Sequence, residues 1–119
     1  VGVYKEGHEN TLYVDFLGVD MATVGPGKTA RGACISTKSH AFDAMTVEEA
    51  RAIARADFAE LQTKYGGILE VRRPGHPLFR QKVEVTRLRL VYDAEMVKID
   101  KMRAAILRAL EGKVEVHFQ

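Results

Sequence analysis

The sequence of 119 residues predicts an α+β fold whose elements follow the order strand, helix, strand, strand, helix, strand over residues 31–119. Two stretches, starting near Thr46 and Asp93, carry apolar residues at the spacing of amphipathic helices. The segments around them alternate in polarity with the two-residue period of strands. Hydrophobic residues make up 46% of the chain, enough for a core, so we expect a single domain over residues 1–119.

Residues 1–30 are expected to form an N-terminal β-hairpin and a loop ahead of this core. Residues 1–4 and 11–17 are predicted as strands around a polar turn. Gly25-Pro26-Gly27 is the strongest breaker in the loop that follows. The hairpin would extend an edge of the sheet or fold over it.

The first helix has a clear start and end. Thr46 and Glu49 fit a capping box, in which the hydroxyl and the carboxylate each take an orphan backbone N–H. Gly66-Gly67 supplies the stop. The apolar stripe between them consists of Val47, Ala50, Ile53, Ala54, Phe58, Leu61 and Tyr65. The preceding segment, 30–42, alternates weakly; we expect a strand near 32–39, with a short helix as the alternative.

The second half begins with a strand at 68–73 and a turn at 74–77. The long strand 82–92 changes phase, because Val83 and Val85 share one face whereas Leu88, Leu90 and Tyr92 share the other. A bulge near Thr86, or apolar cover on both faces, would reconcile them. Asp93 is expected to cap the second helix, and residues 113–118 form the last strand. The helix stripe is Ile99, Met102, Ile106, Ala109 and Leu110.

This order is the ferredoxin-like βαββαβ arrangement, which implies an antiparallel sheet with two helices on one face. The RNA-recognition motif family shares that fold, but residues 82–89 do not match its aromatic signature.

Composition bounds the function. The net charge of +2 permits a nucleic-acid partner without requiring one. No apolar run approaches the roughly 18 residues that span a bilayer, so a soluble protein without a membrane partner is expected. The single Cys34 cannot form an internal disulfide, which favours a reducing, intracellular compartment.

No catalytic or metal-binding pattern stands out, and we expect neither a metal nor a cofactor. His8, His40, His76 and His117 are not at ligand spacing. His40 and Asp43 could form an acid–base pair. Residues 22–29 meet the loosest form of the phosphate-binding loop, with Ala22 in place of its first glycine. Pro26 removes one N–H donor from that loop, so a nucleotide site is not expected there.

Asp57 lies inside the apolar stripe of the first helix, between Ala54 and Leu61. A carboxylate that faces a core needs a partner, and Arg87 or Arg89 on the long strand are the candidates for a buried polar group. The alternative is a position at the edge of the stripe that reaches solvent.

The strongest candidate surface is the segment 72–82, called the arm below. Its Arg and Lys side chains could hold phosphates while an aromatic ring stacks on a base. It could also dock on a protein through its apolar pair, or be a solvated edge loop. The candidate partner-binding residues are Arg72, Arg73, His76, Leu78, Phe79, Arg80 and Lys82.

The sequence therefore favours a non-catalytic binding module, in first place a small structural or accessory subunit of a protein assembly, which could be an oligomer. The alternative is a nucleic-acid-binding module that uses the basic, Pro-rich arm. A small enzyme of unknown class ranks third.

Overall fold

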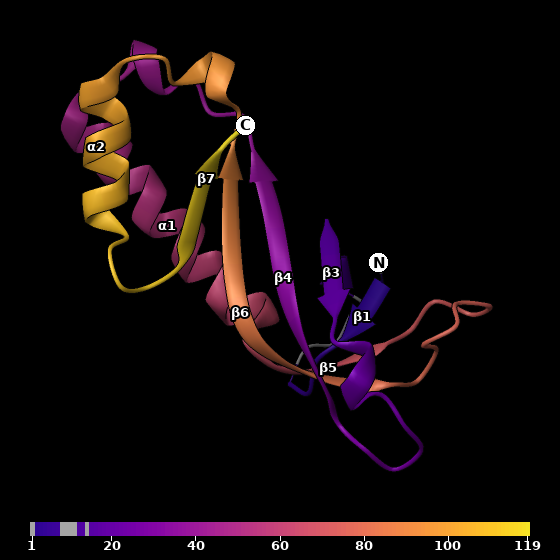
Figure 1. The fold of residues 1–119 in the computed structure, drawn as a ribbon. Coiled ribbons are helices and arrows are strands. Elements are labelled where there is room, and N and C mark those ends of the chain that lie inside the picture. Colours follow the sequence, from indigo (N-terminus) through magenta and orange to yellow (C-terminus); the bar gives the residue numbers. More distant parts are fainter. Residues whose placement is uncertain (1, 8–11, 14) are drawn as a thin grey trace.

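The computed structural model describes residues 2–7, 12–13 and 15–119, and it shows an α+β fold in which a curled sheet carries helices at one end (Figure 1). The helices are α1 (Val47–Tyr65) and α2 (Asp100–Ala109). The short 3₁₀ turns are η1 (Met21–Thr23), η2 (Phe42–Ala44) and η3 (Ala94–Met96). The strands are β1 (Gly2–Tyr4), β2 (Leu12–Tyr13), β3 (Phe16–Val19), β4 (Ala30–Lys38), β5 (Gly67–Val71), β6 (Lys82–Tyr92) and β7 (Glu115–Phe118).

The sheet is mixed and centred on β6. Its order is β2-β1-β5-β6-β4-β3, and β7 pairs with β6 outside this path. β4 runs parallel to β6 along nearly the whole strand. On the opposite edge, β5 pairs antiparallel with the first residues of β6 and β7 pairs parallel with the last ones. One edge of β6 is therefore divided between two short strands.

The α+β class is confirmed, but the ferredoxin-like arrangement is not, because the strand order differs. In that arrangement the last strand lies antiparallel beside the first strand of the core, here β4. The free edge of β4 is instead occupied by β3, which pairs with it antiparallel. β5 stops pairing with β6 at Val85, so β7 takes the half of that edge that remains.

The N-terminal segment also departs from the prediction of one strand over 11–17. Two short strands are present: β2 pairs with β1, and β3 pairs with β4 at the far end of the sheet path. Asp15 lies between them, and its carboxylate accepts hydrogen bonds from the backbone N–H of Thr37 at 2.9 Å and from its hydroxyl. Because the chain joins opposite ends of the path within a few residues, the sheet must curl. Thr11 and Val14 lie outside the described residues.

The predicted bulge at Thr86 is confirmed. Gly32 pairs with Val85 and Ala33 pairs with Arg87, so Thr86 has no partner in the register of β4 and β6. The extra residue reverses the alternation of the strand. Val83 before the bulge and Leu90 after it therefore both point into the core, where each is fully buried.

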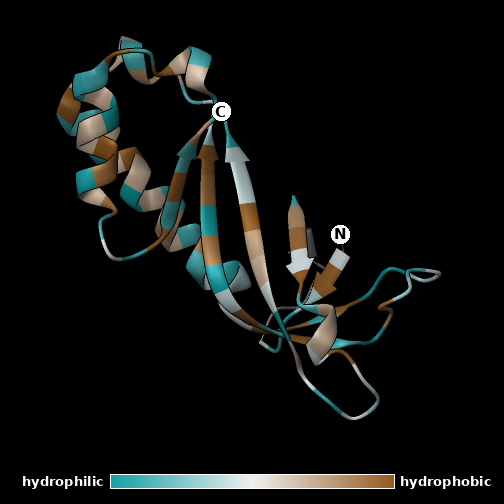
Figure 2. Cartoon of the chain, in the orientation of Figure 1, coloured by the Kyte–Doolittle hydropathy of each residue, from teal (hydrophilic) through white to brown (hydrophobic). Residues whose placement is uncertain are grey.

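The core lies along one face of the sheet. At the helical end, α1 and α2 cover β6 through a cluster that includes Ala54, Leu61, Leu90 and Ile106. At the other end the curled strands bury Val3, Cys34 and Leu69, and beside them Ala30, Val71 and Val83. Figure 2 shows hydrophobic and hydrophilic residues in turn along the helices, as expected where only one side of each is buried.

The helix caps match the prediction in one case only. The backbone N–H of Glu49 donates to the Thr46 hydroxyl at 3.1 Å, so Thr46 is confirmed as the N-cap of α1. The Glu49 carboxylate accepts from the Thr46 hydroxyl at 3.1 Å instead of from a backbone N–H, so the predicted capping box is present in one half. Asp93 instead caps the short turn η3. The segment before α2 is held by Asp43, whose carboxylate accepts from the backbone N–H of Lys98 at 2.7 Å and of Ile99 at 3.2 Å.

The predicted strand near 32–39 is present as β4, and the alternative of a short helix there is wrong. No helix within residues 2–7, 12–13 and 15–119 is long and apolar enough to cross a membrane.

Burial in β4 makes Cys34 a test of the fold. Its side chain is fully buried, and this desolvation raises the pKa of the thiol to about 12. Since the thiolate is the reactive form, we expect iodoacetamide to leave the folded protein unmodified at about pH 8 and to alkylate Cys34 once urea unfolds it. Mass spectrometry measures both. Rapid alkylation of the folded protein would contradict the closed packing of β4 against β1 and β5.

A candidate binding cleft between two loops

Two loops that are distant in sequence lie side by side at the end of the molecule opposite the helices (Figure 1). One is the segment 24–29, called the glycine loop below, and the other is the arm. The glycine loop leads into β4 and the arm leads into β6, and these strands pair from Ala30 and Val83 onward. The side-chain amide of Gln81 ties them together by donating to the backbone carbonyl of Lys28 at 2.7 Å.

Between these loops is a cleft of about 610 Å³. Its walls contain the cations Lys28, Arg80 and Lys82 and no carboxylate. None of these cations forms an ion pair with any residue that the structure describes. The complete lining is Val24, Gly25, Pro26, Gly27, Lys28, Thr29, Pro77, Leu78, Phe79, Arg80, Gln81 and Lys82.

The arm is folded by its own backbone. The N–H of His76 donates to the carbonyl of Arg73 at 3.1 Å, which closes a turn over Pro74-Gly75. The N–H of Phe79 donates to the carbonyl of His76 at 2.9 Å. The His76 ring takes part in this turn as well, because its Nδ1 accepts from the N–H of Leu78 at 3.0 Å. The arm therefore has a defined shape without a partner.

Arg80 has an unusual backbone. Its φ is 68°, in the left-handed region that costs a residue with a Cβ roughly 1–2 kcal/mol. The hydrogen bond from its N–H to the carbonyl of Val71, at 2.8 Å, holds this conformation. Strained backbone of this kind gathers at functional sites, which makes Arg80 a notable part of the cleft wall.

The two apolar residues of the arm, Leu78 and Phe79, have different environments. Leu78 is half-buried and packs against the cluster of Ala30, Val71 and Val83. Phe79 is 40% exposed in the cleft, and the guanidinium of Arg80 lies over its ring, 5.4 Å from the centre. Only Phe79 is therefore available to a partner.

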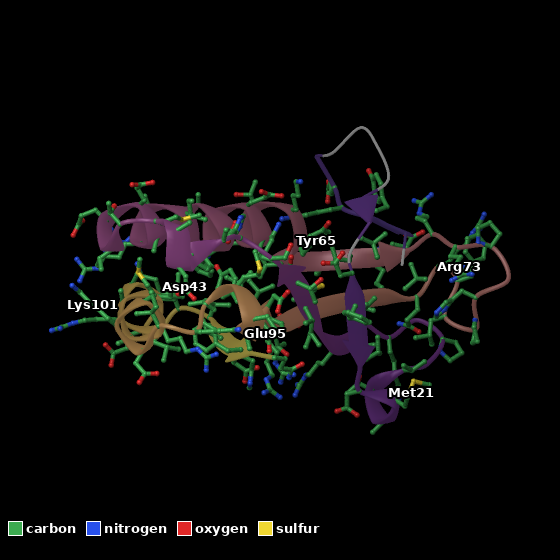
Figure 3. All side chains as sticks on the ribbon, turned by 90° about the horizontal axis from the view of Figure 1, so that it is seen from above. Met21, Asp43, Tyr65, Arg73, Glu95 and Lys101 are labelled. Carbon is green, nitrogen blue, oxygen red and sulfur yellow. The ribbon has the colours of Figure 1, made fainter. Side chains whose placement is uncertain are left out.

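The two adjacent arginines also differ. Arg72 is bound within the protein, since its Nε lies 2.8 Å from the Glu70 carboxylate and its guanidinium lies over the ring of Tyr4. Arg73 is exposed at the end of the molecule farthest from α2, as Figure 3 shows by its position opposite Lys101. The pair is thus not one charged unit.

The contribution of the glycine loop was missed by the sequence analysis. Residues 22–29 match the pattern of a nucleotide-binding loop, which begins a helix, whereas here they lead into β4. Nothing in the local sequence indicates that Lys28 lies beside Gln81. One feature of the sequence could have indicated that the two loops are neighbours: each of them immediately precedes a long strand.

A second polar group lies at the helical end. Asp57 of α1 is only 8% exposed, and its carboxylate accepts a hydrogen bond from the Tyr92 hydroxyl at 2.8 Å. His40 Nε2 lies 3.0 Å from the same carboxylate. Burial, followed by the negative charge of Asp57, raises the pKa of Tyr92. Phe42 packs edge-on against the rings of His40 and Tyr92. Asp57 and Tyr92 are therefore buried, whereas His40 reaches solvent with 34% of its side chain.

Three expectations about these polar residues are wrong. Arg87 and Arg89 do not reach Asp57, because both pair with Glu115 on β7, and Arg87 is exposed rather than buried. His40 pairs with Asp57 rather than with Asp43, which is occupied by backbone N–H groups ahead of α2. The strand order accounts for the first result, since β7 beside β6 offers Glu115 on the face away from the helices.

Among the described residues, no group of three His, Cys, Asp or Glu side chains could hold a metal ion. His8 lies outside these residues. No family model, curated protein or solved structure matches this chain.

Proposed function

We propose that this protein is a binding module that holds a polyanion in the cleft between the glycine loop and the arm, and that nucleic acid is its partner. The carrying observation is the charge of the cleft: Lys28, Arg80 and Lys82 line it without a single carboxylate. Phosphate contacts dominate the affinity of proteins for nucleic acids, so unpaired cations around a hollow are the required chemistry.

The arrangement supports binding in two further ways. The internal hydrogen bonds of the arm mean that little conformational entropy is lost when a partner orders it. Phe79 offers an aromatic ring beside the cations, a combination that nucleic-acid-binding surfaces use for bases and phosphates together. The intracellular location that the unpaired Cys34 favours also suits such a partner.

The second candidate is a subunit of a protein assembly. Two observations favour it. Phe16 on β3 is 58% exposed on the face of the sheet away from the core, and among the described residues β7 pairs only through its β6 edge. An open strand edge can accept a strand from another protein. The arm itself supports this candidate less, because Leu78 packs into the core.

Salt dependence tests the proposal. Binding of a fluorescent oligonucleotide is measured by anisotropy between about 50 and 200 mM salt, where phosphate contacts lose affinity steeply. Replacing Lys28 and Lys82 together by Gln should weaken binding to oligonucleotides of every base sequence. It should also make the slope of log K against log salt shallower by about 1.4, because each phosphate contact that is lost to a single strand accounts for about 0.7.

A charge-matched control comes from the opposite end of the molecule. Lys101→Gln with Arg108→Gln removes the same charge from two exposed positions on α2 and should leave affinity and slope unchanged. Equal weakening by both double variants would mean that only net charge matters, and the cleft would not be the site. A native complex that persists in high salt without nucleic acid would favour the assembly subunit instead.

A further inference from the structure

We infer that the polyanion is a single-stranded polynucleotide, with one base stacked on Phe79 and the adjoining phosphates held by Lys28 and Lys82. This inference rests on the proposed function and specifies its partner. It is carried by the shape of the cleft, the exposure of one aromatic ring and the position of the helices.

The shape of the cleft separates single strands from duplexes. Direct reading of duplex sequence mainly uses a helix or a two-stranded ribbon placed into the major groove, which is about 12 Å wide. Here the cations line a hollow of about 610 Å³, within the roughly 300–1,000 Å³ of pockets that enclose small molecules. A base with its sugar and phosphate fits such a hollow, whereas an intact duplex does not enter it.

The helices are not placed to enter the groove of a duplex beside the cations of the cleft. α1 and α2 both lie at the end of the molecule away from the cleft, and their buried faces cover the sheet (Figure 1). Of the described residues, neither α1 nor α2 is therefore presented beside Lys28, Arg80 and Lys82. The described part of the basic end consists of loops, strand ends and the short turn η1.

Phe79 supplies the stacking surface. Its ring is 40% exposed, and the guanidinium of Arg80 lies over it, 5.4 Å from the ring centre. A base would use the opposite face, so the ring would be held between a cation and a nucleobase. Every base has a π-face, which makes this contact tolerant of sequence.

A rival geometry uses other residues. If the arm entered a duplex groove, its tip would make the contacts, and Arg73 would be the principal cation there. Lys28 and Phe79 face the cleft rather than the tip, so they would contribute little. Substitutions at Phe79 and Arg73 therefore distinguish the two geometries.

The experiment compares labelled oligo(dT), oligo(rU) and a DNA duplex of about 12 nucleotides, within the 4–16 nucleotides of single-strand sites. We expect both single strands to bind more tightly than the duplex. The ratio of the affinities for oligo(dT) and oligo(rU) shows whether the sugar contributes to binding. Phe79→Leu should weaken single-strand binding by about 5- to 150-fold, as loss of base stacking does, without changing the salt slope.

Phe16→Leu is the matched control, because Phe16 is more exposed than Phe79 and lies on β3, outside the cleft. It should bind like the unaltered protein. Thermal unfolding of both variants verifies that they remain folded.

The failures are distinguishable. Duplex binding as tight as single-strand binding, insensitive to Phe79→Leu and weakened by Arg73→Gln, would overturn the single-strand inference. Nucleic acid would remain the partner, but it would be held at the tip of the arm rather than in the cleft. No salt-dependent binding to any of the three probes would overturn both.

Discussion

Replacement of Ile106 by Ala is expected to lower the free energy of unfolding by about 2–5 kcal/mol. Ile106 is fully buried on α2, in the cluster that joins α1, α2 and β6. Truncation removes apolar contacts and leaves a cavity, because neighbouring side chains fill the space only partly. Urea unfolding followed by circular dichroism measures the loss.

The next residue on the helix gives the control. Leu107 is 45% exposed, so Leu107→Ala truncates an aliphatic side chain of the same size with much less loss of packing and only a small change of helix propensity. We expect a change below about 1 kcal/mol. Equal effects at the two positions would place Ile106 outside the core and contradict the packing of α2.

Tyr92→Phe is expected to lower the free energy of unfolding by about 1.5–3 kcal/mol, the usual range for a hydrogen bond to a charged group. The Tyr92 side chain is fully buried, and its hydroxyl donates to the Asp57 carboxylate at 2.8 Å. The variant keeps the ring and removes this donor, which leaves the carboxylate with His40 as its remaining side-chain partner among the described residues.

The same residue predicts a pH dependence. The pKa of Tyr92 is raised in the folded state above its ordinary value of 10.0. Its contribution to stability is therefore complete below about pH 10 and falls as pH rises further, because the unfolded state ionises first. Tyr92→Phe should remove this part of the alkaline decline.

A double-mutant cycle separates the hydrogen bond from general damage. Tyr92→Phe and Asp57→Asn are measured alone and together by urea unfolding. If the groups act as a pair, the double variant loses less stability than the sum of the single losses. Strict additivity would show that the hydroxyl and the carboxylate do not interact energetically.

The bulge at Thr86 shows how far local pattern reaches. Val83 and Val85 are out of phase with Leu88, Leu90 and Tyr92, and one inserted residue is the simplest way to put all of them on one face. The structure has that bulge. Strand alternation is a property of the backbone itself, so a break in it is visible in the sequence.

The position of β7 shows where local pattern stops. Its residues read correctly as a strand, but pairing with β4 and pairing with β6 bury the same alternate side chains. The choice depends on β3, which occupies the β4 edge. That pairing joins segments more than ten residues apart and was not predicted, because residues 11–17 were expected to form a hairpin with residues 1–4.

For this protein the sequence by itself determined the α+β class, the long helix and its cap, the bulge and the basic arm. All of these follow from the backbone preferences and side-chain periodicity of neighbouring residues. Only the tertiary structure decided the strand order, the Tyr92 and His40 partners of Asp57, and the cleft. Each of these depends on which distant segments share a strand pair or a layer of the core, and residues 28 and 81 become neighbours only when β4 pairs with β6.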